Sequence, residues 1–264
     1  MNIVDQYSDA PLSIKRLLQR GDIRVIEIGC SSSHVYRLSN ADQTFYLKTQ
    51  SATAEPSFAH EAAILEWLRE RLPVPEVLEF FSGTEHEYLV LSEVPGDNCV
   101  DAMALLDHGQ IARLLAAGLR MIHGVDIADC PFDERIAAKL KNARYNVEHR
   151  LVDESDFDPE PLGTMTAQEV LDQLERKRPA EPDLVFNHGD YCLPNILLQN
   201  SEISGFIDLS RAGVADRYND LAIASRSVRY NLGPEFEDLF FEYYELDQVD
   251  EDKIAYYRMM DELF

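Results

Sequence analysis

Polar side chains interrupt an otherwise apolar stretch between Val185 and Gly213, VFNHGDYCLPNILLQNSEISGFIDLSRAG. In chain order these polar residues are His188, Asp190, Asn195 and Asp208. Asp190 and Asn195 stand at the two ends of one short loop between predicted strands, and Asp208 ends a following strand. Because strand ends and the loops between them hold side chains in fixed geometry, we expect Asp190, Asn195 and Asp208 to converge on one point.

This set suits the transfer of a phosphoryl group from a nucleotide. That reaction needs positioning and charge neutralisation more than covalent chemistry from the protein. Mg²⁺ prefers oxygen ligands, so Asn195 and Asp208 are candidate metal ligands, and Asp190 is a candidate base for an incoming hydroxyl. An Asn five residues after the Asp matches the catalytic loop of protein kinases. In the alternative interpretation these residues only close turns, and His188 is structural.

The same chemistry requires a strand lysine for the phosphates and a helix glutamate that holds this lysine. Lys48 lies at the end of the strand pattern TFYLKTQ, and Glu61 lies near the start of the next predicted helix. Each residue has an ordinary alternative role, as a solvated charge and as a carboxylate at a helix N-terminus. Their occurrence in the required order favours the phosphoryl-transfer interpretation.

Other candidate nucleotide contacts are inferred from position alone. The serine loop between the first two strands could approach phosphates through Ser31, Ser32 and Ser33, although it lacks a GxGxxG pattern. The segment from Ser92 to Val94 joins the two predicted lobes, where its backbone could meet an adenine edge. Tyr46 could stack on the base, although most residues in such positions are ordinary core.

The distribution of strand and helix patterns along the chain predicts an α+β, two-lobed fold. Residues 1–94 contain five short strand patterns and one helix pattern, at 56–72, which predicts a small antiparallel sheet. Residues 95–264 are mainly helical. The expected helices of this larger lobe cover 106–126, 139–152, 166–178, 221–230, 234–246 and 251–264. The helix at 166 begins with a capping-box pattern, and residues 153–163 form an acidic loop.

Composition excludes several classes of partner. The chain has 264 residues and a formal net charge of −24, which disfavours nucleic acid and anionic membranes and favours cationic partners. No apolar run is long enough to span a bilayer, and the N-terminus lacks a signal-peptide pattern. The four cysteines form no CxxC pair. We expect a cytoplasmic protein with reduced thiols and no obligate protein partner.

Several segments resemble the bacterial aminoglycoside 3′-phosphotransferases across nearly the whole chain. They are HGDYCLPNILL, GFIDLSRAGVADRYNDLAIASRS and YYRMMDELF, with YLK, LPVPEVL, LSE and HGVDIADCPF in support. The resemblance implies a fold like that of protein kinases. It also implies Mg²⁺-dependent phosphorylation of a sugar hydroxyl on kanamycin-type aminoglycosides, and hence antibiotic resistance. ATP is the implied donor, with GTP as the alternative.

The resemblance also implies roles for individual residues. Asp190 is the base, Lys48 and Glu61 form the phosphate-binding pair, Asn195 and Asp208 hold Mg²⁺, and Tyr46 and 92–94 bind adenine. Arg211 and Arg226 match positions near the family's active site. Asp261, Glu262 and the carboxylate of Phe264 match aminoglycoside contacts. The acidic loop, including Asp158 and Glu160, suits a polycationic substrate, although a disordered acidic surface loop would have the same composition.

Some positions depart from the family pattern. Leu193 stands where some members carry an acid, and Tyr230 and Asn231 stand where some carry two. These changes could narrow the substrate range. A related small-molecule kinase acting on choline or a macrolide, and an inactive kinase-like binding protein, are the alternative functions. The acidic terminus and loop argue against the first, and the intact Lys48, Asp190, Asn195 and Asp208 argue against the second.

Overall fold

The computed structural model describes the chain except for residues 1–5, 21, 27–32 and 40–42 and the side chains at 20, 160 and 161. The chain divides into two compact units. The first contains Met1–Pro95 and Gly205–Ser210, and the second contains Gly96–Ser204 and Arg211–Phe264. The sequence-based boundaries had placed 205–210 with the helical lobe, whereas the structure groups this segment with the sheet-rich unit.

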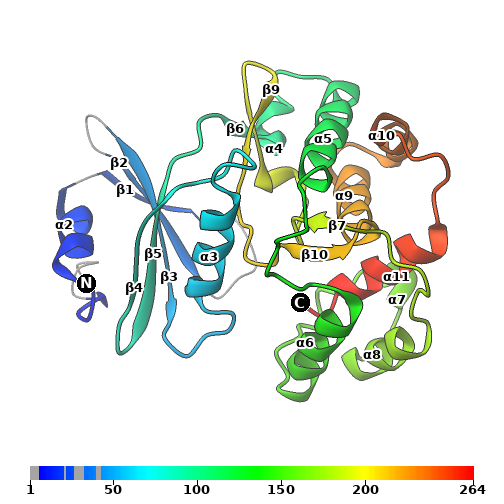
Figure 1. The fold of residues 1–264 in the computed structure, drawn as a ribbon, viewed down its shortest axis with the longest axis horizontal. Coiled ribbons are helices and arrows are strands. Elements are labelled where there is room, and N and C mark those ends of the chain that lie inside the picture. The colour runs from blue at the N-terminus through cyan, green and yellow to red at the C-terminus, as the bar shows by residue number, and fades with distance from the viewer. Residues whose placement is uncertain (1–5, 21, 27–32, 40–42) are drawn as a thin grey trace. The chain divides into compact units, whose positions relative to one another are not determined.

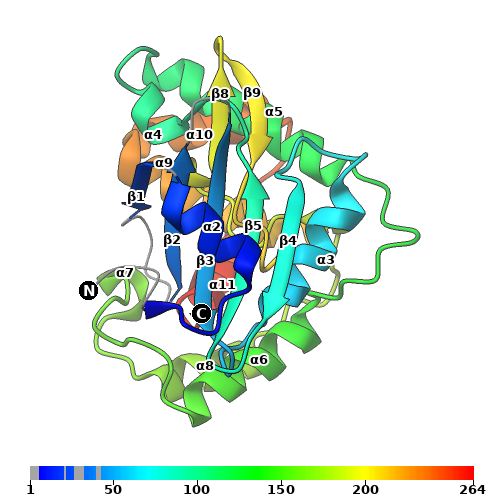
Figure 2. The same cartoon turned by 90° about the vertical axis from the view of Figure 1, so that its left-hand side faces the viewer.

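A five-stranded antiparallel sheet forms the first unit. Its strands are β1 (Asp22–Ile26), β2 (His34–Ser39), β3 (Thr44–Ser51), β4 (Val77–Ser82) and β5 (His86–Ser92), in the order β1-β2-β3-β5-β4. Two helices, α2 (Leu12–Arg20) and α3 (Phe58–Leu68), cover opposite faces of this sheet (Figures 1 and 2). The predicted sheet and the helix α3 are confirmed, while α2 was not predicted.

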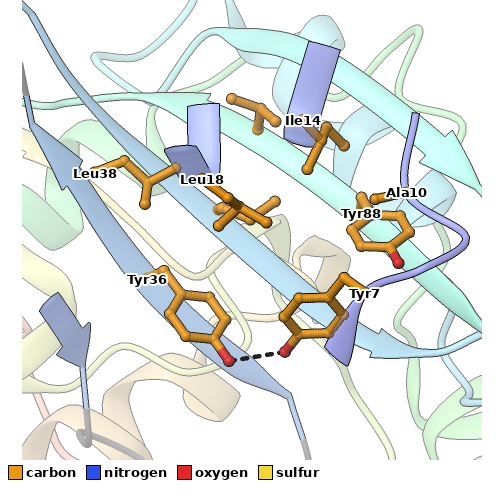
Figure 3. Close-up of a cluster of buried hydrophobic side chains, with 9 residues drawn as sticks. Tyr7, Ala10, Ile14, Leu18, Tyr36, Leu38 and Tyr88 are labelled. Carbon is orange, nitrogen blue, oxygen red and sulfur yellow. Dashed lines mark hydrogen bonds between the residues drawn. The ribbon is translucent and has the colours of Figure 1, made fainter. Parts of the chain in front are cut away.

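The helix α2 covers one sheet face through a compact core (Figure 3). Ile14 and Leu18 stand one helical turn apart and are buried against the sheet. Beside them, the hydroxyl of Tyr7 is hydrogen-bonded to those of Tyr36, at 2.7 Å, and Thr49, at 2.9 Å. The segment from Tyr7 to Leu18 is therefore an integral part of the sheet-rich unit.

Helices dominate the second unit. They are α4 (Cys99–Ala102), α5 (His108–His123), α6 (Ile136–Glu148), α7 (Pro159–Leu162), α8 (Ala167–Arg176), α9 (Tyr218–Asn231), α10 (Glu237–Tyr244) and α11 (Glu251–Asp261). The structure confirms the capping box at the start of α8, where Thr166 and Glu169 bond reciprocally. Within the predicted acidic loop, the structure forms the one-turn helix α7. In this unit α10 packs on α5, and α11 packs on α9.

Short strands support the loop that carries Asp190. The strand β7 (Leu184–Asn187) pairs with β10 (Gly213–Asp216), which the sequence had not indicated. A second small sheet has the order β6 (Asp97–Asn98), β8 (Ile196–Gln199) and β9 (Glu202–Phe206). The strand predicted to end at Asp208 ends at Phe206. Among the helices that the structure describes, none combines the length and apolarity needed to cross a bilayer.

Candidate active site

In the first unit, Lys48 bridges two carboxylates. Its ammonium lies 2.7 Å from Oε2 of Glu61 and 3.1 Å from Oδ1 of Asp208. Glu61 is 2% exposed, whereas the side chain of Asp208 is half exposed. Although burial acts to lower it, the charges of Glu61 and Asp208 hold the pKa of Lys48 above its ordinary value. Lys48 therefore remains a cation at neutral pH, with one buried partner and one accessible partner.

The alternation of β3 places Lys48 on the face covered by α3. Leu47 and Thr49 point to the opposite face, into the core under α2. Tyr46 is two residues from Lys48 and shares its face. A buried glutamate, Glu87, then fixes α3 against the sheet.

Glu87 lies on β5, opposite Gln50 of β3, and accepts hydrogen bonds from three partners. They are the amide of Gln50 (3.0 Å), the hydroxyl of Ser57 (2.7 Å) and the backbone N–H of Phe58 (2.9 Å). Ser57 is also the N-cap of α3. Glu87 thus ties the start of α3 to the sheet, which holds Glu61 one turn further along against Lys48. The sequence analysis missed Glu87, because nothing in a strand pattern distinguishes a buried glutamate from an exposed one.

Asp208 has an unusual backbone conformation. Its φ is 60°, in the left-handed region that non-glycine residues seldom adopt. Two residues before Asp208, the N–H of Phe206 donates a hydrogen bond to the carbonyl of Pro73, at 2.9 Å. Such conformations persist where the surrounding structure holds them and occur preferentially at functional sites.

The other nucleotide candidates are less defined. Tyr46 lies opposite Arg37 in the β2–β3 ladder and interacts with its side chain. The backbone N–H and the hydroxyl of Ser92 are both engaged with Glu76, at 2.9 Å each. Val94 is partly buried, and Ser33 directly precedes β2. Ser31 and Ser32 lie outside the described residues.

In the second unit, the loop after β7 holds Asp190 and Asn195 together. The amide nitrogen of Asn195 donates to the backbone carbonyl and to Oδ2 of Asp190, at 3.0 Å each. This arrangement directs the amide hydrogens of Asn195 to Asp190 and leaves its Oδ1 as the amide's acceptor for another group. The two residues predicted to stand at opposite ends of one loop are brought together.

The loop turns at Gly189, which has a φ of 88°. A Cβ at this position would lie 2.0 Å from the carbonyl oxygen of Arg211, so only glycine fits. The guanidinium of Arg211 in turn donates a hydrogen bond to the carbonyl of Gly189, at 2.8 Å. The β7–β10 ladder brings these segments side by side by pairing Asn187 with Gly213.

Asp220 holds the same loop through hydrogen bonds to its backbone. This fully buried carboxylate accepts the backbone N–H groups of His188 (2.6 Å) and Gly189 (2.9 Å) and lies 3.3 Å from Nε2 of His123. Burial acts to raise the pKa of Asp220, but His123 and the bonds from the loop hold it below its ordinary value. His188 is itself buried, and its Nδ1 accepts the N–H of Asp190, at 3.3 Å. The sequence analysis missed Asp220, which lies in the quoted segment DRYNDLAIASRS.

Two arginines and two acids form a cluster at the end of α11. Arg211 lies 2.6 Å from Oδ1 of Asp261, and Arg226 contacts both Asp261 and Glu262, the latter at 2.9 Å. Burial acts to raise the pKa of Asp261, but the two guanidinium groups hold it below its ordinary value. The ring of Phe264 lies 5.6 Å from the guanidinium carbon of Arg211. All four predicted charges are therefore brought together, as ion pairs.

Comparisons with known proteins place the chain among its relatives. The model of the Phosphotransferase enzyme family (APH) matches residues 22–259. An aminoglycoside 3′-phosphotransferase of Niallia circulans is 37% identical over 96% of this chain and 97% of the relative. One from Streptomyces fradiae is 33% identical over 96% of this chain and 98% of the relative. The chain belongs to the aminoglycoside phosphotransferase family.

Solved structures of the family share the fold. The crystal structure of an aminoglycoside-3′-phosphotransferase of type VIII has a TM-score of 0.84 and 32% identity, over 100% of this chain and 98% of that one. An aminoglycoside phosphotransferase from Streptomyces rimosus, solved with ADP and streptomycin, has a TM-score of 0.77 and 24% identity, over 99% of this chain and 96% of that one. The predicted kinase-like α+β architecture is thereby confirmed.

Within this family framework, the positions that depart from the pattern have distinct environments. Leu193 is fully buried, so its side chain fills core space. Asn231 donates to the backbone of Ser227, at 2.8 Å, whereas Tyr230 is 89% exposed. In the acidic segment, the N–H of Asp158 donates to Glu262, at 3.2 Å. Glu160 lies in α7, and its side chain is outside the described set.

Proposed function

We propose that this chain transfers the γ-phosphate of ATP to the 3′-hydroxyl of kanamycin-type aminoglycosides, and that the reaction confers antibiotic resistance in the cytoplasm. The full-length similarity to relatives named aminoglycoside 3′-phosphotransferase carries the proposal. The geometry of Lys48, Asp190 and Asn195 supports it, because each is held as phosphoryl transfer requires.

On this proposal, Lys48 binds the phosphates of the nucleotide. Glu61 keeps the ammonium in place, since the buried pair fixes its position. Tyr46 stacks on the base, 92–94 meet its edge, and the serine loop, Ser31 to Ser33, approaches the phosphates. GTP is the alternative donor, and a direct comparison of the two nucleotides decides between them.

Asn195 and Asp208 would hold Mg²⁺. Both offer oxygen atoms, as this hard cation prefers: Oδ1 of Asn195 is not used in the bonds to Asp190, and the carboxylate of Asp208 is half exposed. When bound, the ion supplies charge neutralisation at the phosphates. Asp208 would exchange part of its contact with Lys48 for this role.

Asp190 is the proposed base. Its carboxylate would orient the 3′-hydroxyl and accept its proton, while the amide of Asn195 fixes Oδ2. The backbone of the loop is immobilised by Asp220 and Arg211, so that the carboxylate has a defined direction.

The proposed substrate contacts are acidic. Asp261, Glu262 and Phe264 lie at the cluster that contains Arg211 and Arg226, and Asp158 and Glu160 come from the acidic segment. Aminoglycosides carry several ammonium groups, which such carboxylates attract and bind by charge-assisted hydrogen bonds. The pairing of Asp261 and Glu262 with arginines leaves each carboxylate further lone pairs for an ammonium group.

The test is an ADP-release assay with Mg²⁺ and ATP, comparing kanamycin with the 3′-deoxy aminoglycoside tobramycin. We expect turnover with kanamycin alone. Asp190→Asn, which preserves the size of the side chain, is expected to lower kcat by about 10²–10⁴-fold. Turnover with both compounds would refute the 3′ position. Turnover with neither, in folded protein, would refute the proposed reaction.

A further inference from the structure

The metal-binding candidate Asn195 ends a single 3-10 turn, Leu193–Asn195. The turn is closed by the N–H of Asn195, which donates to the carbonyl of Cys192, at 3.0 Å. The side chain of Asn195 reaches back to Asp190. The direction of its Oδ1 therefore depends on how this short turn is seated.

Ser227, on the helix α9, holds this turn in place. The backbone N–H of Leu193 donates to the hydroxyl of Ser227 on α9, at 3.0 Å. Leu193 is 0% exposed and Ser227 is 9% exposed. A buried N–H needs a partner, and within the described part of the chain Ser227 Oγ is the acceptor recorded for it. This contact links the proposed base-and-metal loop directly to the body of the second unit.

The hydroxyl of Ser227 is itself held. The amide of Asn231 donates to the backbone carbonyl of Ser227, at 2.8 Å, and approaches its Oγ, at 3.4 Å. A carboxylate at position 231 could donate neither bond, because ionised Asp is an acceptor only. Asn231 therefore supports the helix end on which Ser227 is mounted.

We infer that Ser227 is a positioning residue for Mg²⁺ binding, acting through the Leu193–Asn195 turn and supported by Asn231. This inference rests on the proposed function, because it assumes that Asn195 is a metal ligand. Without the hydroxyl, the N–H of Leu193 loses its acceptor. The turn then moves, and the Oδ1 of Asn195 no longer keeps its direction. We expect the effect to be specific to the metal and to the loop, since the hydroxyl of Ser227 bonds the N–H of Leu193 and lies near the amide of Asn231.

The first experiment measures the half-saturating Mg²⁺ concentration of Ser227→Ala at saturating ATP and kanamycin. We expect it to rise by about tenfold, as is typical when a residue that orients a metal ligand is removed. The KM for kanamycin should not change. Asn231→Asp should give a smaller shift in the same direction, and it serves as the second variant if Ser227→Ala does not fold.

Ser225→Ala is the matched control. Ser225 is also a buried serine on α9, but its hydroxyl bonds Ala222 and Arg258 and does not contact the loop. We expect it to lower the melting temperature at least as much as Ser227→Ala, with an unchanged Mg²⁺ requirement. Equal Mg²⁺ shifts in the two variants, or no shift in Ser227→Ala and Asn231→Asp, would overturn the inference.

A second readout does not depend on activity. Hydrogen exchange at the amide of Leu193, measured without ligands, should be faster in Ser227→Ala than in wild type and unchanged in Ser225→Ala. Unchanged exchange in Ser227→Ala would show that the serine does not hold the turn. By contrast, a wild-type protein that protects this amide but does not phosphorylate kanamycin would refute the proposed function and leave the seating of the turn established.

Discussion

Each unit contains one group of charged candidate residues, and the two groups are built differently. In the first unit one cation, Lys48, serves two carboxylates, and one of these, Glu61, is almost fully buried. At the end of α11 two cations serve two carboxylates, with Asp261 and Arg226 each making two contacts. The first group depends on a single residue, whereas the second is a network.

This difference predicts unequal tolerance to mutation. Removing the lone cation leaves Glu61 buried without a counter-charge, which is strongly unfavourable. Removing Glu262 from the network leaves Asp261 paired with both arginines. We therefore expect variants of Lys48 to lose stability together with activity. Variants of the network should change substrate binding with a smaller loss of stability.

Lys48→Met should have the largest effect. We expect kcat/KM to fall by about 10²–10³-fold, as when one charge-stabilising group is removed from an active site. The free energy of unfolding should fall by about 3–5 kcal/mol, because Glu61 loses its partner. Steady-state kinetics and urea denaturation measure the two effects separately.

The double variant Lys48→Met/Glu61→Leu is the control. Replacing a buried ion pair by apolar residues is often neutral for stability, so we expect most of the lost stability to return without activity. Activity within a fewfold of wild type in Lys48→Met would contradict the assigned role. If stability stays low in the double variant, the loss in Lys48→Met does not come from the broken ion pair with Glu61.

The same comparison shows what the sequence could predict. Lys48, Glu61, Asp190, Asn195 and Asp208 could be predicted as site residues because fixed order and short spacing carry their signal. The five-stranded sheet followed from alternation and turn residues. Glu87, Asp220 and Ser227 were missed, because each acts on a partner about thirty residues away and none belongs to a local pattern.

Other errors have a similar cause. The pairing of β7 with β10 joins residues that are 26 apart at Asn187 and Gly213, so no hairpin signal marks it. The helix α2 is short, and its burial depends on contacts with Tyr36 and Leu38 of the sheet. Tertiary contacts decided these elements, and local propensity did not indicate them.

Glu262→Gln tests the network. Arg226 keeps its contact with Asp261, so the free energy of unfolding should fall by less than in Lys48→Met. If Glu262 binds an ammonium group, the KM for kanamycin should rise by about tenfold, since one charge-assisted hydrogen bond is weakened. The KM for ATP should not change.

Glu251→Gln makes the same charge change at an exposed position of the same helix. It should leave both KM values unchanged, which separates a direct contact from the general field of the acidic protein. Parallel changes in the KM for kanamycin and for ATP in Glu262→Gln would argue against a substrate contact.

The smallest effect on activity is expected at Asp9, remote in role from either charge group. Its carboxylate accepts the backbone N–H groups of Glu85 (2.9 Å) and His86 (3.0 Å) and the hydroxyl of Tyr88. Burial acts to raise the pKa of Asp9, but these donors hold it well below the ordinary value of 3.8. The unfolded chain therefore binds this proton at higher pH than the folded protein does.

The sign of the pH dependence follows. The stabilisation by Asp9 is fully present above about pH 5 and is lost as the pH falls from there toward the lowered pKa. Asp9→Asn should lower the free energy of unfolding at pH 7 by about 1–3 kcal/mol and should lose less stability than wild type between pH 5 and pH 3. Urea denaturation at pH 7, 5 and 3 measures both, with Asp22→Asn, an exposed residue paired with Arg24, as the control. If the free energy of unfolding of Asp9→Asn fell between pH 5 and pH 3 as steeply as that of wild type, Asp9 would not determine the acid response. Other carboxylates, such as Asp220 and Asp261 of the second unit, would then determine it.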